Sequence, residues 1–216
     1  MSIKAVIFDS DGTLFNSGEL IIAAYFHVAD THNLPRPSVA AIRSRLAVAM
    51  PLEQIFSELF PGENSQLLLA TNAQYISNNL VRMTAYDGVE DLLSELHQQG
   101  YKLALFTGGT AVIIDAYKHH KLDHLFSTFV HSERITRHKP HPEGIMLAAK
   151  ECEVPVSETI MVGDSRSDVI AGKSAGCAAT IGVTHGNDSR EALQLAEADY
   201  IIDSLMDLPQ ILASIK

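Results

Sequence analysis

Residues 3–13 read IKAVIFDSDGT, an apolar run with Lys4 as its one charge that leads directly into two aspartates. The run predicts a buried β-strand, and in an open α/β sheet the carboxyl end of such a strand faces the crevice where ligands bind. Side chains two residues apart lie on the same side of a strand, so we expect Asp9 and Asp11 to face one small volume. Carboxylates this close repel each other, which indicates a bound cation or a raised pKa.

The composition is that of a globular protein with an acidic surface. The chain has 216 residues, 46% of them hydrophobic, a formal net charge of −10 and no run of lysine or arginine. This charge argues against nucleic acid or an anionic membrane as a partner. The lack of a long apolar run and of a signal-peptide pattern favours a cytoplasmic location. Cys152 and Cys177 have no metal-ligand spacing and are expected to be reduced core residues.

The hydrophobic pattern divides the chain into two parts. Between residues 17 and 83 it predicts four short helices, interrupted by Pro- and Gly-containing breaks at 33–37, 50–51 and 60–62. Elsewhere strands are expected at 102–106, 126–130, 159–162, 178–183 and 199–202, and helices at 88–99, 111–120, 142–152, 166–175 and the C-terminus. This alternation predicts an α/β, Rossmann-like core over 1–16 and 84–216, a parallel sheet with helices on both faces, and a helical insertion over 17–83.

Polar residues stand at several other places where predicted strands end. Residues 107–109, Thr-Gly-Gly, follow one strand, and Asp164 and Asp168 follow another, while Lys139 lies in a loop before a helix. The carboxyl ends of strands in a doubly wound sheet converge on one crevice. A simple Asp-Gly turn would explain residues 9–13 taken alone, but it would not explain the other polar groups.

Taken together, these segments resemble the four ordered motifs of the haloacid dehalogenase-like hydrolase superfamily. Residues 9–13 correspond to the first motif, Thr107 to the second, Lys139 in a Lys-Pro-x-Pro context to the third, and Gly163-Asp164 with Asp168 to the fourth. Four motifs in order are far more specific than any one of them. The helical block 17–83 looks like the mobile cap domain of the phosphoglycolate phosphatase and phosphoglucomutase branches.

The resemblance implies phosphoryl transfer through a covalent intermediate. Asp9 would be the nucleophile that forms an aspartyl-phosphate, and Asp11 the general acid that protonates the leaving group and then activates water. Lys139 would supply positive charge to the phosphoryl oxygens. Thr107 would bind a phosphoryl oxygen through its hydroxyl.

Mg²⁺ is the cofactor that the resemblance implies, and oxygen ligands suit this hard cation. Its expected ligands are Asp9, the main-chain carbonyl of Asp11, and Asp164. Asp168, four residues after Asp164 on one helix face, would either bind a metal-ligated water or hold Lys139.

Two segments depart from the common pattern of the family. Gly108 stands where asparagine often follows the Thr or Ser, so we expect the backbone N–H groups of Gly108 and Gly109 to help bind the phosphoryl group. Residues 47–52 lack the glycine-containing turn that is common at that place in the cap. Arg43 and Arg45 are candidates to pair with a carboxylate of the substrate, although arginines in such a pattern more often belong to a solvated helix face.

These residues predict a Mg²⁺-dependent phosphatase acting on a small phosphorylated metabolite, as a monomer or homodimer. Segments 182–186 and 198–203 resemble the phosphoglycolate phosphatase branch, which makes phosphoglycolate the leading substrate. Asp11 disfavours dehalogenation, and the absence of lysine from 16–83 excludes phosphonatase chemistry. A β-phosphoglucomutase-like phosphotransferase, which would need a histidine where Ile21 stands, and an inorganic pyrophosphatase are the alternatives. A non-catalytic binding protein is less favoured because the motif aspartates are intact.

Overall fold

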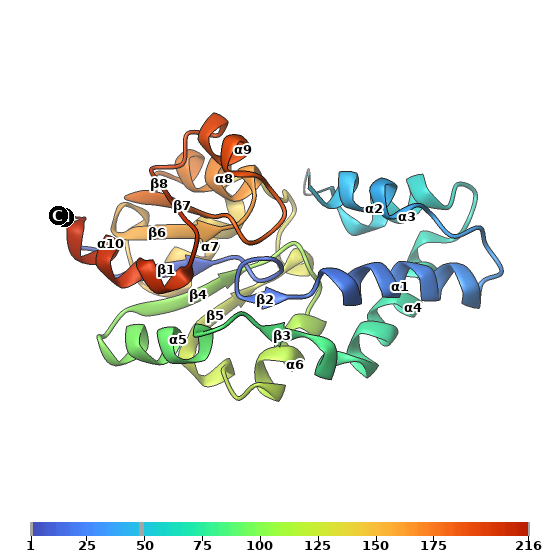
Figure 1. The fold of residues 1–216 in the computed structure, drawn as a ribbon, viewed down its shortest axis with the longest axis horizontal. Helices are drawn as coiled ribbons and strands as arrows, with labels where there is room; N and C mark the ends of the chain where they lie inside the picture. The colour runs from blue at the N-terminus through green and yellow to red at the C-terminus, as the bar shows by residue number, and fades with distance from the viewer. Residues whose placement is uncertain (1, 48–49, 216) are drawn as a thin grey trace.

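The computed structural model describes residues 2–47 and 50–215 and contains a central parallel sheet of six strands (Figure 1). Its strand order is β5-β4-β1-β6-β7-β8, and each pair of neighbours is parallel. The strands are β1 (Ala5–Phe8), β4 (Lys102–Phe106), β5 (Phe126–Val130), β6 (Thr159–Gly163), β7 (Ala179–Val183) and β8 (Tyr200–Ile202). The predicted α/β, Rossmann-like fold is therefore confirmed, with β1, which carries the two aspartates at its end, inside the sheet.

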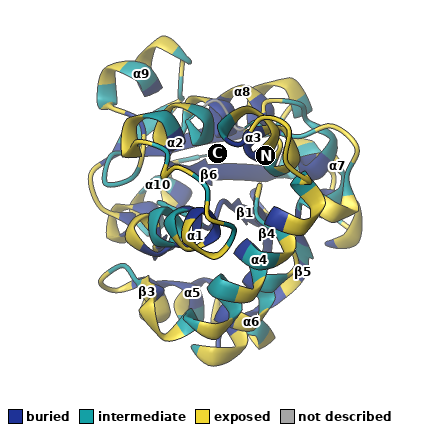
Figure 2. Ribbon diagram, turned by 90° about the vertical axis from the view of Figure 1, so that its right-hand side faces the viewer, coloured by how far each residue is buried: buried dark blue, intermediate teal, exposed yellow. Residues whose placement is uncertain are grey.

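Alternate side chains of β1 enter two different hydrophobic cores. Val6 and Phe8 pack in the cluster that includes leucines of α5 (Val89–Gln98) and α10 (Leu208–Ser214). Ala5 and Ile7 pack in the cluster that includes residues of α7 (Glu143–Glu151) and α8 (Arg166–Ala175). Figure 2 shows the buried strands enclosed between helices that expose their outer faces. The helices of this part are α5 (Val89–Gln98), α6 (Val112–His119), α7 (Glu143–Glu151), α8 (Arg166–Ala175), α9 (Arg190–Leu195) and α10 (Leu208–Ser214). None of the helices within the described residues is long and apolar enough to cross a membrane.

The helical block lies at one end of the molecule, at the right of Figure 1. Its helices are α1 (Gly18–Thr31), α2 (Val39–Leu46), α3 (Leu52–Leu59) and α4 (Ser65–Asn78), as the breaks in the sequence predict. They share a hydrophobic cluster of their own, in which the ring of Tyr25 stacks on that of Phe56 at 4.9 Å. This block thus has a core separate from those that flank the sheet.

Two chain segments join the helical block to the sheet. They pair as the antiparallel strands β2 (Phe15–Asn16) and β3 (Thr84–Ala85). On the sheet side, the ring of His185 lies with its Nε2 3.0 Å from the carbonyl oxygen of Thr13. The connection is therefore short, and a side chain from the loop after β7 holds it close to the end of β1.

Candidate active site

A tight turn fixes the two aspartates at the end of β1. The N–H of Asp9 donates to the carbonyl of Val162 in the neighbouring strand at 2.9 Å, which continues the sheet by one residue. The carbonyl of Ser10 then accepts the N–H groups of Thr13, Leu14 and Phe15 at 3.2, 2.9 and 3.0 Å. The chain reverses at Gly12, whose φ of +86° is a backbone conformation that residues other than glycine rarely adopt.

Asp9, Lys139, Asp164 and Asp168 come together at this edge of the sheet, and all four are buried. Ligand oxygens of the three aspartates lie within 4.8 Å of one another. The ammonium Nζ of Lys139 lies 2.6 Å from Asp9 Oδ1 and 2.7 Å from Asp168 Oδ1. Asp168 was expected either to bind a metal-ligated water or to hold Lys139, and the structure shows the contact with Lys139.

The cluster has more negative than positive charge. Burial raises the pKa of Asp9 well above its usual value, Lys139 opposes this rise, and the carboxylates of Asp168 and Asp164 add to it. Burial disfavours the ammonium of Lys139, but Asp168 and Asp9 outweigh that effect and raise its pKa. One ammonium cannot balance three carboxylates, and the donors are all oxygens, so the residues present fit a hard divalent cation such as Mg²⁺.

Asn187 and Thr13 hold the carboxylate of Asp164 from both sides. The backbone N–H and the side-chain Nδ2 of Asn187 donate to Asp164 Oδ2 at 2.6 and 2.7 Å, and Thr13 Oγ1 donates to Oδ1 at 3.1 Å. Burial and Asp168 raise the pKa of Asp164 to about 6, and these donors limit the rise. A Cβ on Gly12 or Gly186 would come within 2.4 or 2.2 Å of the same carboxylate oxygen. Both glycines therefore leave the space into which Asp164 fits.

Asn187→Ala should weaken Mg²⁺ binding about tenfold near neutral pH, because it removes a hydrogen bond to an ionised group. The lost donor raises the pKa of Asp164 further, so protons compete with the cation over a wider range. Titration calorimetry should accordingly show a larger deficit at pH 6.5 than at pH 8.5. Asn78→Ala, on the exposed end of α4, is the matched control. A deficit that does not change with pH would contradict this role of Asn187.

Asp11 lies apart from the carboxylate cluster. Burial raises the pKa of its carboxyl group, and the nearby Ser17 hydroxyl and Lys139 oppose the rise. A Cβ placed on Gly109 would lie 3.8 Å from Asp11 Oδ2, so this side chain faces the loop that follows β4. A carboxyl group with a raised pKa in this position suits a proton donor better than a side-chain metal ligand.

In the loop after β4, the N–H of Gly109 has a partner within the protein, although we expected it to help bind the phosphoryl group. Thr107 is buried, and its Oγ1 accepts the N–H of Gly109 at 3.0 Å. That N–H is therefore engaged within the loop, although the sequence favours it as a phosphoryl ligand. Gly108 is exposed, and the carbonyl of Gly109 accepts the N–H of Ser132 at 2.9 Å. The loop is thus tied both to itself and to the segment after β5.

The two arginines of α2 are not at the carboxylate cluster. Arg45 Nε lies 3.0 Å from Glu58 Oε2, and its NH1 donates to the carbonyl of Ala41 at 2.8 Å, so its charge is used within the helical block. Arg43 is exposed. Of the atypical segment 47–52, Val48 and Ala49 lie outside the described residues.

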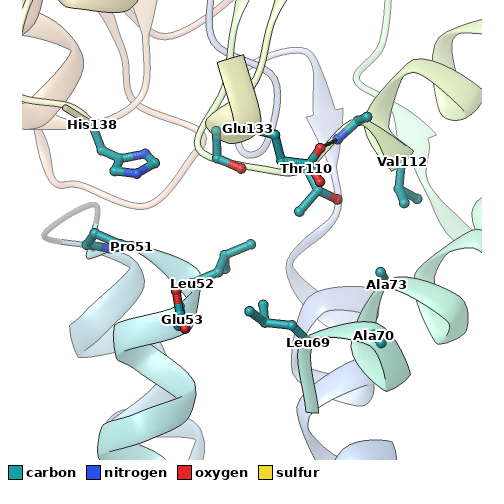
Figure 3. Close-up of a pocket in the computed structure, with 12 residues that line it drawn as sticks. Pro51, Leu52, Glu53, Leu69, Ala70, Ala73, Thr110, Val112, Glu133 and His138 are labelled. Atoms are coloured by element: carbon teal, nitrogen blue, oxygen red, sulfur yellow. Dashed lines mark hydrogen bonds between the residues drawn. The ribbon is translucent and has the colours of Figure 1, made fainter. Parts of the chain in front are cut away.

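A cleft of about 390 Å³ separates the helical block from the sheet (Figure 3). Helices α3 and α4 form one wall, and the loops after β4 and β5 and the residue before Lys139 form the other. The lining includes Leu52, Glu53 and Leu69 on the first side and Thr110, Glu133 and His138 on the second. The cleft therefore lies beside the residues that the sequence assigns to phosphoryl binding.

Known proteins resemble this chain along almost its whole length. The profile of the haloacid dehalogenase-like hydrolases matches residues 6–183. A pyrophosphatase PpaX from Anoxybacillus flavithermus is 31% identical and covers 98% of this chain and 98% of its own length. The pyrophosphatase PpaX of Halalkalibacterium halodurans is 30% identical over 98% of this chain and 97% of its own.

Solved structures share the fold. A predicted phosphoglycolate phosphatase from Haemophilus somnus superimposes with a TM-score of 0.84 at 24% identity, over 98% of both chains. A predicted phosphatase from Clostridium acetobutylicum gives 0.83 at 25% identity, over 99% of this chain and 100% of its own.

Proposed function

Because this chain belongs to the haloacid dehalogenase-like hydrolases, we propose that it is a Mg²⁺-dependent phosphatase that uses Asp9 as nucleophile on a small phosphomonoester. The observation that carries the proposal is the position of Asp9. Its carboxylate stands at the carboxyl end of a buried strand, 2.6 Å from the ammonium of Lys139 and inside a cluster of oxygen ligands. An anionic nucleophile beside a fixed positive charge is what attack on a phosphoryl group requires.

We assign residues 1–16 and 84–216 to the catalytic core and residues 17–83 to a cap domain. The separate hydrophobic cluster of α1–α4 supports this division, as does the pair of short strands that joins the two parts. A cap hinged at β2 and β3 would cover the substrate and exclude water while the reaction proceeds.

In the first step a carboxylate oxygen of Asp9 attacks phosphorus, and the bond from phosphorus to the leaving oxygen breaks. The leaving oxygen takes the proton of the Asp11 carboxyl group, whose raised pKa keeps that proton available. The ammonium of Lys139 and the hydroxyl of Thr107 stabilise charge on the phosphoryl oxygens. The products are the free alcohol and an aspartyl-phosphate.

In the second step water attacks the phosphorus of the aspartyl-phosphate. The Asp11 carboxylate accepts a proton from that water, the bond from phosphorus to Asp9 breaks, and inorganic phosphate leaves. Asp9, Asp164 and the main-chain carbonyl of Asp11 are the ligands that we assign to Mg²⁺, which supplies neutralisation of the phosphoryl charge when it is bound. Asp168 holds Lys139 in place, since its Oδ1 lies 2.7 Å from Nζ.

Hydrolysis of pyrophosphate is a second candidate function, because relatives at about 30% identity are named pyrophosphatases. The same residues would serve this reaction, with phosphate in place of an alcohol as the leaving group. A mutase is less favoured, since Ile21 offers no group that could take part in proton transfer.

Phosphate release from para-nitrophenyl phosphate, a panel of phosphomonoesters and pyrophosphate tests the proposal. We expect turnover of monoesters that is lost when EDTA removes the metal and restored by Mg²⁺. A preference for pyrophosphate over every monoester would favour the second function. Turnover that EDTA leaves unchanged would contradict the metal dependence.

A further inference from the structure

The cleft between α3, α4 and the core begins next to the proposed phosphoryl site. Its core wall starts at Thr110, in the loop that begins with Thr107, and includes His138, which precedes Lys139 in the chain. The N–H of Ser132, a further residue of this wall, is bonded to the carbonyl of Gly109. The leaving group of a phosphate bound at Asp9 would enter this cleft if it continued along the wall that begins at Thr110 and His138.

The walls of the cleft are largely apolar. Leu52, Leu69 and Ala73 come from the helical block, and Val112 faces them from the start of α6 (Figure 3). A volume of 390 Å³ lies within the range of about 300–1,000 Å³ that is typical of small-molecule sites. A glycolate group or a second phosphate is much smaller than this space and would leave the apolar walls without a partner.

The charged side chains that line the cleft are carboxylates. Glu53 lies on the helical side and Glu133 on the core side. Glu133 is held in place, because its Oε2 accepts the N–H of Ala111 at 2.9 Å. Neither lysine nor arginine is found among the described residues that line the cleft, and the ammonium of Lys139 is directed to Asp9 and Asp168 instead. A negative charge at the far end of a leaving group would meet repulsion here.

We propose that this cleft selects phosphomonoesters of an alcohol with an apolar stem and a neutral or amine-bearing end, and that it disfavours phosphoglycolate and pyrophosphate. This assignment rests on the proposed phosphatase activity. The apolar stem of the alcohol would contact Leu52, Leu69 and Val112. Its neutral or amine-bearing end would lie near Glu53 and Glu133. Arg45 provides no compensating charge, since it is paired with Glu58.

Three phosphate esters that differ only at the far end test the assignment: aminohexyl phosphate, hexyl phosphate and the phosphate ester of hydroxyhexanoate. We expect kcat/KM for the amine and the neutral ester to exceed that for the acid about tenfold or more. Phosphoglycolate and pyrophosphate should be as poor as the acid. Para-nitrophenyl phosphate measures phosphatase activity independently of this choice.

Variants of the walls should change the preference without changing the reaction. Glu53→Gln combined with Glu133→Gln should reduce the ratio of amine to acid at least fivefold. Ala70→Arg, at an exposed position of α4 that lines the cleft, should raise the rate with the acid. Glu95→Gln, an exposed glutamate of α5 bonded to Gln99, is the matched control and should leave the ratio unchanged.

The outcomes distinguish an error in the substrate class from an error in the proposed phosphatase activity. A preference for the acid, phosphoglycolate or pyrophosphate over hexyl phosphate would overturn the substrate class while the phosphatase activity stands. An unchanged amine-to-acid ratio in the double variant would remove Glu53 and Glu133 from specificity. Inertness towards every ester, para-nitrophenyl phosphate included, would overturn the proposed function and the substrate class with it.

Discussion

Asp9→Asn should lower phosphate release by roughly four orders of magnitude or more, because an amide cannot serve as the attacking nucleophile. The change keeps the size and shape of the side chain in its buried site. Lys139 keeps one partner in this variant, since Asp168 Oδ1 also lies 2.7 Å from its Nζ. The substitution also removes one of three carboxylates that repel one another, so the folded protein should be at least as stable without metal as the native one.

Initial rates and thermal unfolding in EDTA, measured on the same preparations, check both expectations. Asp91→Asn, on the exposed side of α5, is the control for the chemical change alone. Labelled phosphate should be trapped on the native protein by rapid acid quenching and should be absent from Asp9→Asn. A residual rate above a few per cent of native, in a folded variant, would assign the nucleophile to another group.

Much of the fold follows from local patterns that the sequence displays. The strands of the parallel sheet are short, largely apolar runs, and β1, β6 and β7 are buried at every residue. All six were predicted to within two residues of their observed ends, whereas the short antiparallel pair β2 and β3 was not predicted. Helix ends depend on individual caps: Ser165 and Asp168 form a capping box, and α8 begins at Arg166 as predicted. Helix α9 (Arg190–Leu195) was not predicted, because six residues are too few to show a helical period.

The candidate site was predictable to the extent that it is built from strand ends. The carboxyl ends of β1 and β6 lie next to each other, so Asp9 and Asp164 had to approach. Asn187 was missed because it lies 23 residues beyond Asp164 in a loop without a recognised motif. The signal that could have found it is a polar residue after β7, the strand adjacent to β6. The pairing of Arg45 with Glu58 depends on how α2 packs on α3, which no local pattern specifies.

Lys139→Met should lower kcat/KM by about three orders of magnitude and destabilise the metal-free protein most at alkaline pH. The side chain is buried between Asp9 and Asp168, and breaking a buried ion pair from one side costs about 3 kcal/mol or more. The ammonium Nζ also lies 4.7 Å from the centre of the Phe106 ring, so methionine, which keeps an apolar stem of similar length, loses this cation–π contact together with the charge. Both effects have the same origin, because the ammonium of Lys139 favours the ionised form of Asp9 and so opposes the rise of its pKa.

The direction of the pH dependence follows from Asp9. Its pKa in the folded protein is raised by burial and partly restrained by Lys139, so the variant should raise it further. A group whose folded pKa exceeds its unfolded value loses stabilisation as the pH rises through the folded pKa. The gap in melting temperature between the native protein and Lys139→Met should therefore widen from pH 5 to pH 8, measured in EDTA.

The same shift should move the acidic limb of the pH–rate profile to higher pH, since Asp9 must be ionised to attack. Lys118→Met is the matched control, because this lysine is exposed and contacts Asp115 at 3.3 Å on the surface of α6. It should change neither the rate nor the melting temperature appreciably. A stability deficit of Lys139→Met that is equal at pH 5 and pH 8 would mean that the residue contributes packing alone, and that the charge of the cluster is balanced by another group.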